Sequence, residues 1–377
     1  MKFCSHCVID SELRPIIESI GQIEDNCPIC GKRKAYIYNT EINSDLTEYF
    51  EEKLLDIYTP ESLLPPDFPA EEKRLLITEL TDRWHLFSDR LTTTDIYHIV
   101  RAICAEKYSS MPSLFDAPIG IAELNDKDFL RKHSLLRSYS WDDFVNSVKK
   151  QNRFHSNHVN LEILNRYCSF IRKVYKKGSI FYRARISTED GFLPEEMGAP
   201  PAEKATAGRA NSAGIRCLYL ASDTETTFHE IRAGAFDYVS VGRFELTEDI
   251  VVVDLKLIDQ ISPFIDGLNV LEHAINKEHL KRINMEISRT LRRNDSILDY
   301  LPTQYIADFI KSITYEGRPE YAGIEYRSTL KKDGHNLAIF YPELFVCKDV
   351  EVYHIKELRY ERDIIMESVV SEQSLRV

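Results

Sequence analysis

Two closely spaced pairs of cysteines near the N-terminus constrain this chain more than any other feature of its sequence. Each pair has two intervening residues and nineteen residues separate the pairs, which are Cys4, Cys7, Cys27 and Cys30. A tight turn of this spacing brings two thiolates to one ion, and Gly31 suits the backbone reversal after the second pair. Four thiolates complete a tetrahedral site with no open position. We therefore expect residues 1–40 to form a module around a structural Zn²⁺.

Alternatives to zinc remain open for these cysteines. The spacing disfavours four unpaired thiols, and the repetition of the pair disfavours a redox dithiol. An iron–sulfur centre uses similar ligands, and His6, between two of the cysteines, could replace one of them. The other four cysteines stand singly in apolar contexts, so in a reducing cytosol they are most simply small buried side chains. They are Cys104, Cys168, Cys217 and Cys347.

Length and charge limit the classes of function. A chain of 377 residues predicts two or three domains. Its formal net charge of −12 implies a surface that repels phosphate backbones, so we do not expect nucleic acid as the main partner. A local basic pocket for a small phosphate-bearing ligand remains compatible with this charge. The sequence has no run of 18 apolar residues and its N-terminus lacks the apolar core of a secretory signal, so we expect a cytoplasmic protein without a membrane span.

Hydrophobic periodicity divides the rest of the chain into two parts. Residues 41–174 have helical spacing, and the expected helices cover 41–58, 71–89, 95–107, 142–149 and 159–174, with a loop at 109–120. After Lys176-Lys177-Gly178 strands are expected at 179–187, 217–221, 238–246, 250–255, 321–329, 335–341 and 344–353, and helices at 267–293 and 297–313. This mixture predicts an α+β domain over 175–350, followed by a charged extension, 351–377.

The first expected strand of this domain carries two arginines. Period-two alternation puts Phe181, Arg183 and Arg185 on one face, where guanidinium groups beside an aromatic ring would suit a pyrophosphate. Taken alone, this strand is better explained by a solvated outer face. The following segment, 188–216, is long, contains glycines and adds Arg209, and long loops of this kind are usually functional or disordered.

The next strand and helix add a tyrosine and a carboxylate. Tyr219 faces away from its leucine neighbours, and Ser222-Asp-Thr-Glu225 forms a capping-box pattern that opens a helix. Glu230 lies two turns into this helix. Taken alone, Glu230 is typical of a surface helix and Tyr219 of a core.

Together, these residues resemble the RES domain, a family named for its Arg, Glu and Ser. The resemblance covers 175–345, with its motifs in the family's order. The motifs are Tyr182-Arg183-x-Arg185, Gly208-Arg209-x-Asn211, Leu218-Tyr219-Leu-Ala221, Thr227-x2-Glu230 and Ile324-x-Tyr326-x-Ser328, supported by Tyr300-Leu301-Pro-Thr-Gln304 and Asn336-Leu-Ala-Ile-Phe340.

The resemblance implies a scaffold akin to ADP-ribosyltransferases and an NAD site lined by Arg183, Arg209, Tyr219, Glu230 and Ser328. In this site Glu230 would stabilise an oxocarbenium-like state through a ribose hydroxyl, and the two arginines would hold phosphates. Tyr219 would stack on nicotinamide, and Ser328 would hydrogen-bond the amide or a ribose. Glu230, Arg183 and Ser328 are the expected catalytic residues.

RES enzymes are described as NAD-degrading toxins that use water or inorganic phosphate as acceptor. We therefore expect an NAD⁺ glycohydrolase or phosphorylase that acts as a growth-arrest toxin or antiphage effector, with an antitoxin or regulatory partner and a homo-oligomeric state. Two alternatives stay open: transfer of ADP-ribose to a macromolecule, and a binding module that carries an inert RES domain.

Residues 1–174 also resemble the N-terminal regions of some RES proteins, including a helical unit of the HEPN group. Arg153 and His158 match the Arg-x4-His signature of HEPN ribonucleases, in which His performs acid–base chemistry. This motif fixes only two residues, and such pairs arise often by chance. We predict that the N-terminal helices regulate or oligomerise the enzyme and cleave no RNA.

Overall fold

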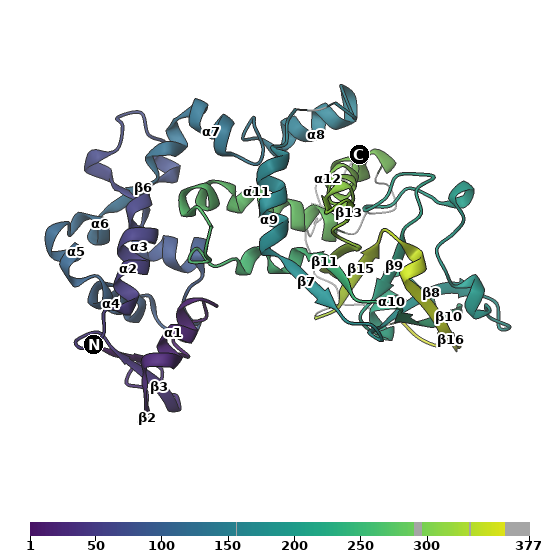
Figure 1. Ribbon diagram of the computed structural model, residues 1–377, viewed down its shortest axis with the longest axis horizontal. Coiled ribbons are helices and arrows are strands. Elements are labelled where there is room, and N and C mark those ends of the chain that lie inside the picture. Colours follow the sequence, from purple (N-terminus) through teal and green to yellow (C-terminus); the bar gives the residue numbers. More distant parts are fainter. Residues whose placement is uncertain (156, 290–295, 332, 359–377) are drawn as a thin grey trace, which may run out of the picture.

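Apolar side chains in the computed structural model gather into two large cores, one in each of two lobes (Figure 1). The structure describes residues 1–155, 157–289, 296–331 and 333–358. The first core contains residues between Phe3 and Ile121, and the second contains residues between Leu135 and Phe340. No helix within these described ranges is long and apolar enough to cross a membrane.

The N-terminal lobe begins with a three-stranded antiparallel sheet that carries the cysteine pairs. Its strands are β1 (Lys2–Cys4), β3 (Arg33–Asn39) and β2 (Gln22–Asn26), with α1 (Leu13–Ile20) between β1 and β2 in the chain. Short helices follow. They are α2 (Asp45–Glu48), α3 (Leu76–Thr78), α4 (Thr93–Ile103), α5 (Ala105–Ser110) and α6 (Ser113–Asp116).

The helices expected over 41–58 and 71–89 are less regular than the sequence pattern suggests. In the first, α2 continues as a π-helix, Tyr49–Leu54, and then as a 3₁₀ turn. In the second, the chain forms a 3₁₀ turn, a two-residue strand, α3 and a π-helix, Glu79–Trp84. The loop expected at 109–120 contains α6 and a strand. That strand, β6 (Pro118–Gly120), pairs with β4 (Thr59–Pro60) and β5 (Arg74–Leu75).

The C-terminal lobe is built on one eight-stranded sheet, which confirms the α+β class. From edge to edge its strands are β16 (Phe345–His354), β10 (Tyr238–Leu246), β8 (Ile180–Ser187), β9 (Leu218–Ala221), β15 (His335–Ile339), β14 (Gly323–Arg327), β11 (Ile250–Asp254) and β7 (Arg172–Tyr175). Only β11 and β14 run parallel among these pairs. Each strand expected after Gly178 is present. The helix expected to continue to 174 ends at Phe170, and β7 follows it.

Helices from two distant parts of the chain share the second core with residues of this sheet. They are α8 (Trp141–Lys150), α9 (Leu161–Phe170), α11 (Val270–Ser288) and α12 (Leu301–Ser312), whereas α7 (Lys127–His133) contacts α11. The end of the helix expected over 267–293 and most of the extension 351–377 lie outside the described residues. The division at residues 40, 174 and 350 remains a proposal.

Helix α11 belongs to both cores and lies between the lobes (Figure 1). Val270 and Ala274 near its start pack in the first core, whereas Leu280, Ile283 and Ile287 pack in the second. The helix is buried on nearly all sides, including several polar residues. Its solvent-exposed residues form only a narrow stripe, which includes Glu278, Arg282 and Met285.

Polar contacts attach α11 to the N-terminal lobe. Arg83 donates to the carbonyl of Ala274 at 3.0 Å, and the rings of Trp84 and His273 lie 5.7 Å apart. The Lys277 ammonium lies 5.2 Å from the centre of the Trp84 ring, and burial lowers the pKa of Lys277 to about 8. The interface between the lobes therefore combines apolar packing with a directional hydrogen bond and a cation–π contact.

A buried carboxylate joins two strands of the large sheet and the turn that follows a third. Glu325 of β14 is fully buried, and its Oε1 accepts hydrogen bonds from Lys256 and, at 3.0 Å, from Lys173 of β7. Its Oε2 accepts from the Tyr175 hydroxyl at 2.8 Å. Burial alone would raise the pKa of Glu325, but the hydrogen bonds from Lys256, Tyr175 and Lys173 outweigh it and lower the pKa.

We predict that Glu325→Gln destabilises the protein by about 2 kcal/mol at pH 7, because Lys173 and Lys256 lose their charged hydrogen-bond acceptor and keep only Asp254, whose Oδ2 lies 3.6 Å from each ammonium. Chemical denaturation with circular dichroism measures this loss. Because folding lowers the pKa of Glu325, its stabilisation is complete above the unfolded-state pKa and disappears as pH falls through the lower folded-state pKa. The difference between wild type and Glu325→Gln should therefore shrink below about pH 4. Glu248→Gln, on an exposed turn, is the matched control, and an equal loss in both variants would contradict the prediction.

Candidate functional site

A pocket of about 560 Å³ opens where two neighbouring strands of the large sheet separate. Strands β8 and β9 are paired at one position, Tyr182 with Ala221, whereas β8 pairs with β10 over eight positions. The pocket wall combines residues of both strands with the loop before β9, α10 (Thr224–Glu230) and the segment before α12. The wall includes Tyr182, Arg183, Ala184, Gly208, Arg209, Tyr219, Ala221, Thr227, Glu230, Ile231, Arg232, Ile297, Tyr300, Tyr326 and Asn336.

Arg183 brings a cation to this wall from β8. Its Nη1 donates to the carbonyl of Gly198 at 3.1 Å. Burial and the neighbouring Arg185 lower the pKa of Arg183 to about 10, so the guanidinium remains charged at neutral pH. Arg185 points to the same segment, where it donates to the carbonyl of Glu196 and lies over the Phe192 ring. Arg185 does not line the pocket.

The loop before β9 is held by hydrogen bonds with the Tyr219 hydroxyl. The Tyr219 hydroxyl donates to Asn211 Oδ1 at 2.7 Å and accepts from the backbone N–H of Ala210 at 3.1 Å. Burial raises the pKa of Tyr219 well above its usual value, so this hydroxyl keeps its proton. A Cβ atom at Gly208 would lie 2.5 Å from the same hydroxyl, so this position requires glycine.

Two side-chain amides, those of Asn211 and Gln304, also hold this loop. The Asn211 amide donates to three carbonyls of its own loop, those of Thr206, Ser212 and Ile215. Gln304 of α12 donates to the carbonyls of Gly208 and Asn211, at 2.8 and 2.9 Å. Both amides are buried, with exposed fractions of 3% and 4%. The backbone that carries Arg209 is therefore fixed from two sides.

Arg209 connects this loop to the shared helix. It lines the pocket, and its Nη1 donates to the carbonyl of Ile287, near the end of α11, at 3.3 Å. Within the described residues, no carboxylate lies within ion-pair distance of Arg183 or Arg209. The pocket therefore contains two guanidinium groups that have no counter-ion among the described residues.

Glu230 supplies the carboxylate at the end of α10. The N-cap of this helix is Asp223, which accepts from the N–H of Thr226, so the helix begins one residue later than the predicted capping box. Glu230 Oε1 accepts from Ser328 Oγ at 2.8 Å and from Asn336 Nδ2 at 2.7 Å. Ser328 lies directly after β14 and is buried behind Glu230, outside the pocket lining.

Four of the five residues expected at the site, Arg183, Arg209, Tyr219 and Glu230, line the pocket, and Ser328 contacts one of them. Other lining residues were not predicted as site residues. Some of them could have been found from the sequence, because they lie within the family motifs, next to or two residues from a predicted site residue. The additional residues are Tyr182, Arg232, Tyr300, Tyr326 and Asn336.

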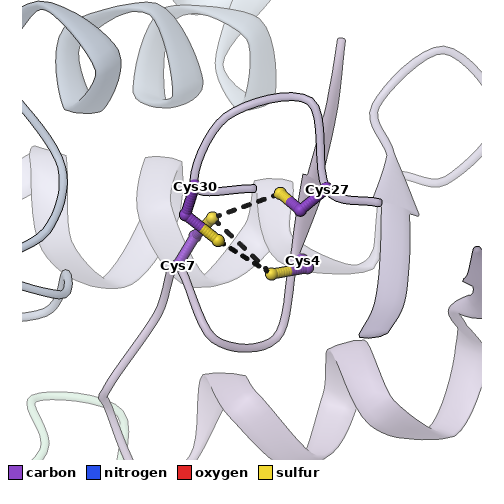
Figure 2. A group of neighbouring side chains, drawn as sticks. All are labelled: Cys4, Cys7, Cys27 and Cys30. Atoms are coloured by element: carbon purple, nitrogen blue, oxygen red, sulfur yellow. Dashed lines mark hydrogen bonds between the residues drawn. The ribbon is translucent and has the colours of Figure 1, made fainter. Parts of the chain in front are cut away.

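The four N-terminal cysteines converge in a second candidate site (Figure 2). The Sγ–Sγ distances are 3.8 Å for Cys4–Cys7, 3.5 Å for Cys4–Cys30 and 3.7 Å for Cys7–Cys27, and all four atoms lie within 4.8 Å of one another. Tetrahedral Zn–S bonds of 2.3 Å require sulfur atoms about 3.8 Å apart. The backbone turns at Gly31 with φ +69°, as expected from the sequence. The cluster is compatible with zinc.

Arg153 and His158 lie in the connection between α8 and α9, outside any helix. Arg153 is exposed, and His158 lines a shallow cavity with residues of α8. That cavity shares no lining residue with the pocket between β8 and β9.

Comparison with known proteins gives one match. Residues 180–363 match the RES domain, a family generally associated with NAD-related toxins. No curated protein and no solved structure matches the chain. The matched segment contains β8, the loop before β9 that carries Arg209, α10, α11 and the strands that surround the pocket. This chain therefore carries a RES domain over residues 180–363.

Proposed function

We propose that the pocket between β8 and β9 binds NAD⁺ and that the protein cleaves the bond between nicotinamide and ribose, by hydrolysis or phosphorolysis. The observation that carries this proposal is the Glu230 carboxylate. One of its oxygens is held by Ser328 and Asn336, and the same pocket is lined by two guanidinium groups that have no counter-ion in the part of the chain that the structure describes. The RES family as a whole supports an enzyme that acts on NAD.

The arginines fit the pyrophosphate of a dinucleotide. Arg183 and Arg209 each donate from one Nη atom to a backbone carbonyl, and a guanidinium has five N–H donors in all. The remaining donors suit phosphate oxygens, which guanidinium forks bind in pairs. Fixing the phosphates would orient the scissile bond against Glu230, and orientation is a large part of the barrier reduction.

Glu230 fits the electronic demand of the reaction. Departure of nicotinamide leaves positive charge on the ribose ring, and a carboxylate bonded to a ribose hydroxyl stabilises that charge. In our proposal Ser328 acts by holding Glu230, and Tyr219 acts mainly by holding the Arg209 loop while its ring forms part of the wall. Water or phosphate then attacks the sugar carbon that nicotinamide has left.

We extend the proposal to physiology. NAD⁺ loss would arrest growth, which fits a toxin or antiphage effector controlled by an antitoxin or other partner. We also propose that the pocket belongs to a scaffold like that of ADP-ribosyltransferases. Transfer of ADP-ribose to a macromolecule would use the same pocket and differs only in the acceptor.

For the cysteine cluster we propose one structural Zn²⁺. Four thiolates leave no coordination position for a substrate, so the ion would crosslink β1 to the turn after β2 and stabilise the first lobe.

We predict that Glu230→Gln lowers kcat for NAD⁺ cleavage by at least about 100-fold with little change in KM, because the lost charge acts mainly in the transition state. Arg183→Ala should instead weaken NAD⁺ binding by about 10-fold or more, since phosphate contacts exist in both states. Mass spectrometry of nicotinamide and ADP-ribose products, with and without inorganic phosphate, measures turnover and identifies the acceptor.

Two controls accompany this experiment. Arg318→Ala removes an exposed arginine on the hairpin of β12 (Thr314–Tyr315) and β13 (Arg318–Pro319) and should leave turnover unchanged. His158→Ala should also leave turnover and toxicity unchanged, and loss of toxicity with normal turnover would favour the ribonuclease alternative. A folded Glu230→Gln protein with wild-type turnover would show that another group performs the chemistry.

We predict about one zinc per chain in purified protein, measured by elemental analysis. Cys27→Ser should lose the metal and lower the unfolding temperature of the first lobe, because three remaining thiolates bind zinc more weakly. Cys347→Ser, outside the cluster, should retain both metal and stability. Protein without metal, or with a coloured iron centre, would contradict this assignment.

A further inference from the structure

Asn336 holds the Glu230 carboxylate from the middle of the large sheet. It lies on β15, between Ala221 of β9 and Tyr326 of β14 in the strand register. Its side chain is 4% exposed, and its amide donates to Glu230 Oε1 at 2.7 Å. Because strands pair with β15 on both sides, the backbone of Asn336 is fixed by the sheet.

The second donor to Glu230 is held less firmly. Ser328 follows the last residue of β14, and its hydroxyl also accepts from the N–H of Leu330 at 3.3 Å. A hydroxyl rotates to suit its partners, whereas an amide presents donors in a fixed plane. Asn336 is therefore the more rigid of the two groups that orient Glu230.

Both donors bind the same carboxylate oxygen. Two hydrogen bonds to Oε1, from Ser328 and Asn336, fix the plane of the carboxylate group. Oε2 is then the oxygen left for a ligand in the pocket. A cationic side chain in this place would also attract the substrate phosphates. The uncharged amide of Asn336 orients the carboxylate without that competing attraction.

We propose that Asn336 is a positioning residue that fixes the plane of the Glu230 carboxylate and directs its Oε2 toward the substrate ribose. This inference rests on the proposed NAD⁺ cleavage. Asn336 should therefore affect the chemical step. It should not affect phosphate binding, which we assign to Arg183 and Arg209.

Asn336→Asp tests the proposal because it keeps the shape of the side chain. A protonated Asp can donate to Glu230 as the amide does, whereas an ionised Asp repels it. The activity of Asn336→Asp relative to wild type should therefore rise as pH is lowered from 8 to 5 and fall as pH increases. The matched control Asn146→Asp, exposed on α8, should follow the wild-type profile.

Asn336→Ala provides a second, independent measurement. Removing one hydrogen bond to a charged group should lower kcat by about 10- to 100-fold, while the Kd for NAD⁺ stays within about 3-fold of wild type by calorimetry. Equal loss of kcat and binding, or a wild-type pH profile for Asn336→Asp, would overturn the positioning role. If the wild-type protein itself does not consume NAD⁺, the proposed function fails instead, so the two failures are distinguishable.

Discussion

The separation of β8 from β9 is the constraint on which the rest of the site depends. A continuous sheet has no room for a ligand between its strands, and here the ladder between β8 and β9 has one paired position, Tyr182 with Ala221. The loop before β9 lines the same pocket, and its backbone is held by Asn211, Tyr219 and Gln304. These bonds also fix the position of Arg209 in the wall of the pocket.

The features that were predictable from sequence are those governed by local periodicity. The β8 alternation places Arg183 and Arg185 against one segment, as expected, because side-chain direction in a strand has a period of two residues. Strand positions after Gly178 were predictable for the same reason. The approach of Glu230 to Ser328 spans 98 residues, and only the resemblance to a family, not periodicity, suggested that these residues meet.

Other features depend on tertiary structure and could not be predicted from the hydrophobic pattern of the sequence. Glu325 reads as an ordinary polar position in a half-exposed strand, yet it is fully buried because lysines from β7 and the segment after β11 reach it. Asn336 lay within a recognised motif, but its role requires knowledge of the strand beside it. The π-helical turns at Tyr49–Leu54 and Glu79–Trp84 also follow helical spacing, and their wider hydrogen bonding has no distinct sequence signature.

The position of α11 in the chain has a consequence for the order in which the protein can form during synthesis. Phe264, Val270 and Ala274 complete the core of the first lobe, although the other members of that core end at Ile121. The ribosome must therefore pass Ala274 before the N-terminal core can close. Ser328 and Asn336 are synthesised later still, so Glu230 acquires its two donors only after residue 336 has been added. A chain interrupted anywhere before this point has neither an oriented carboxylate nor a complete pocket.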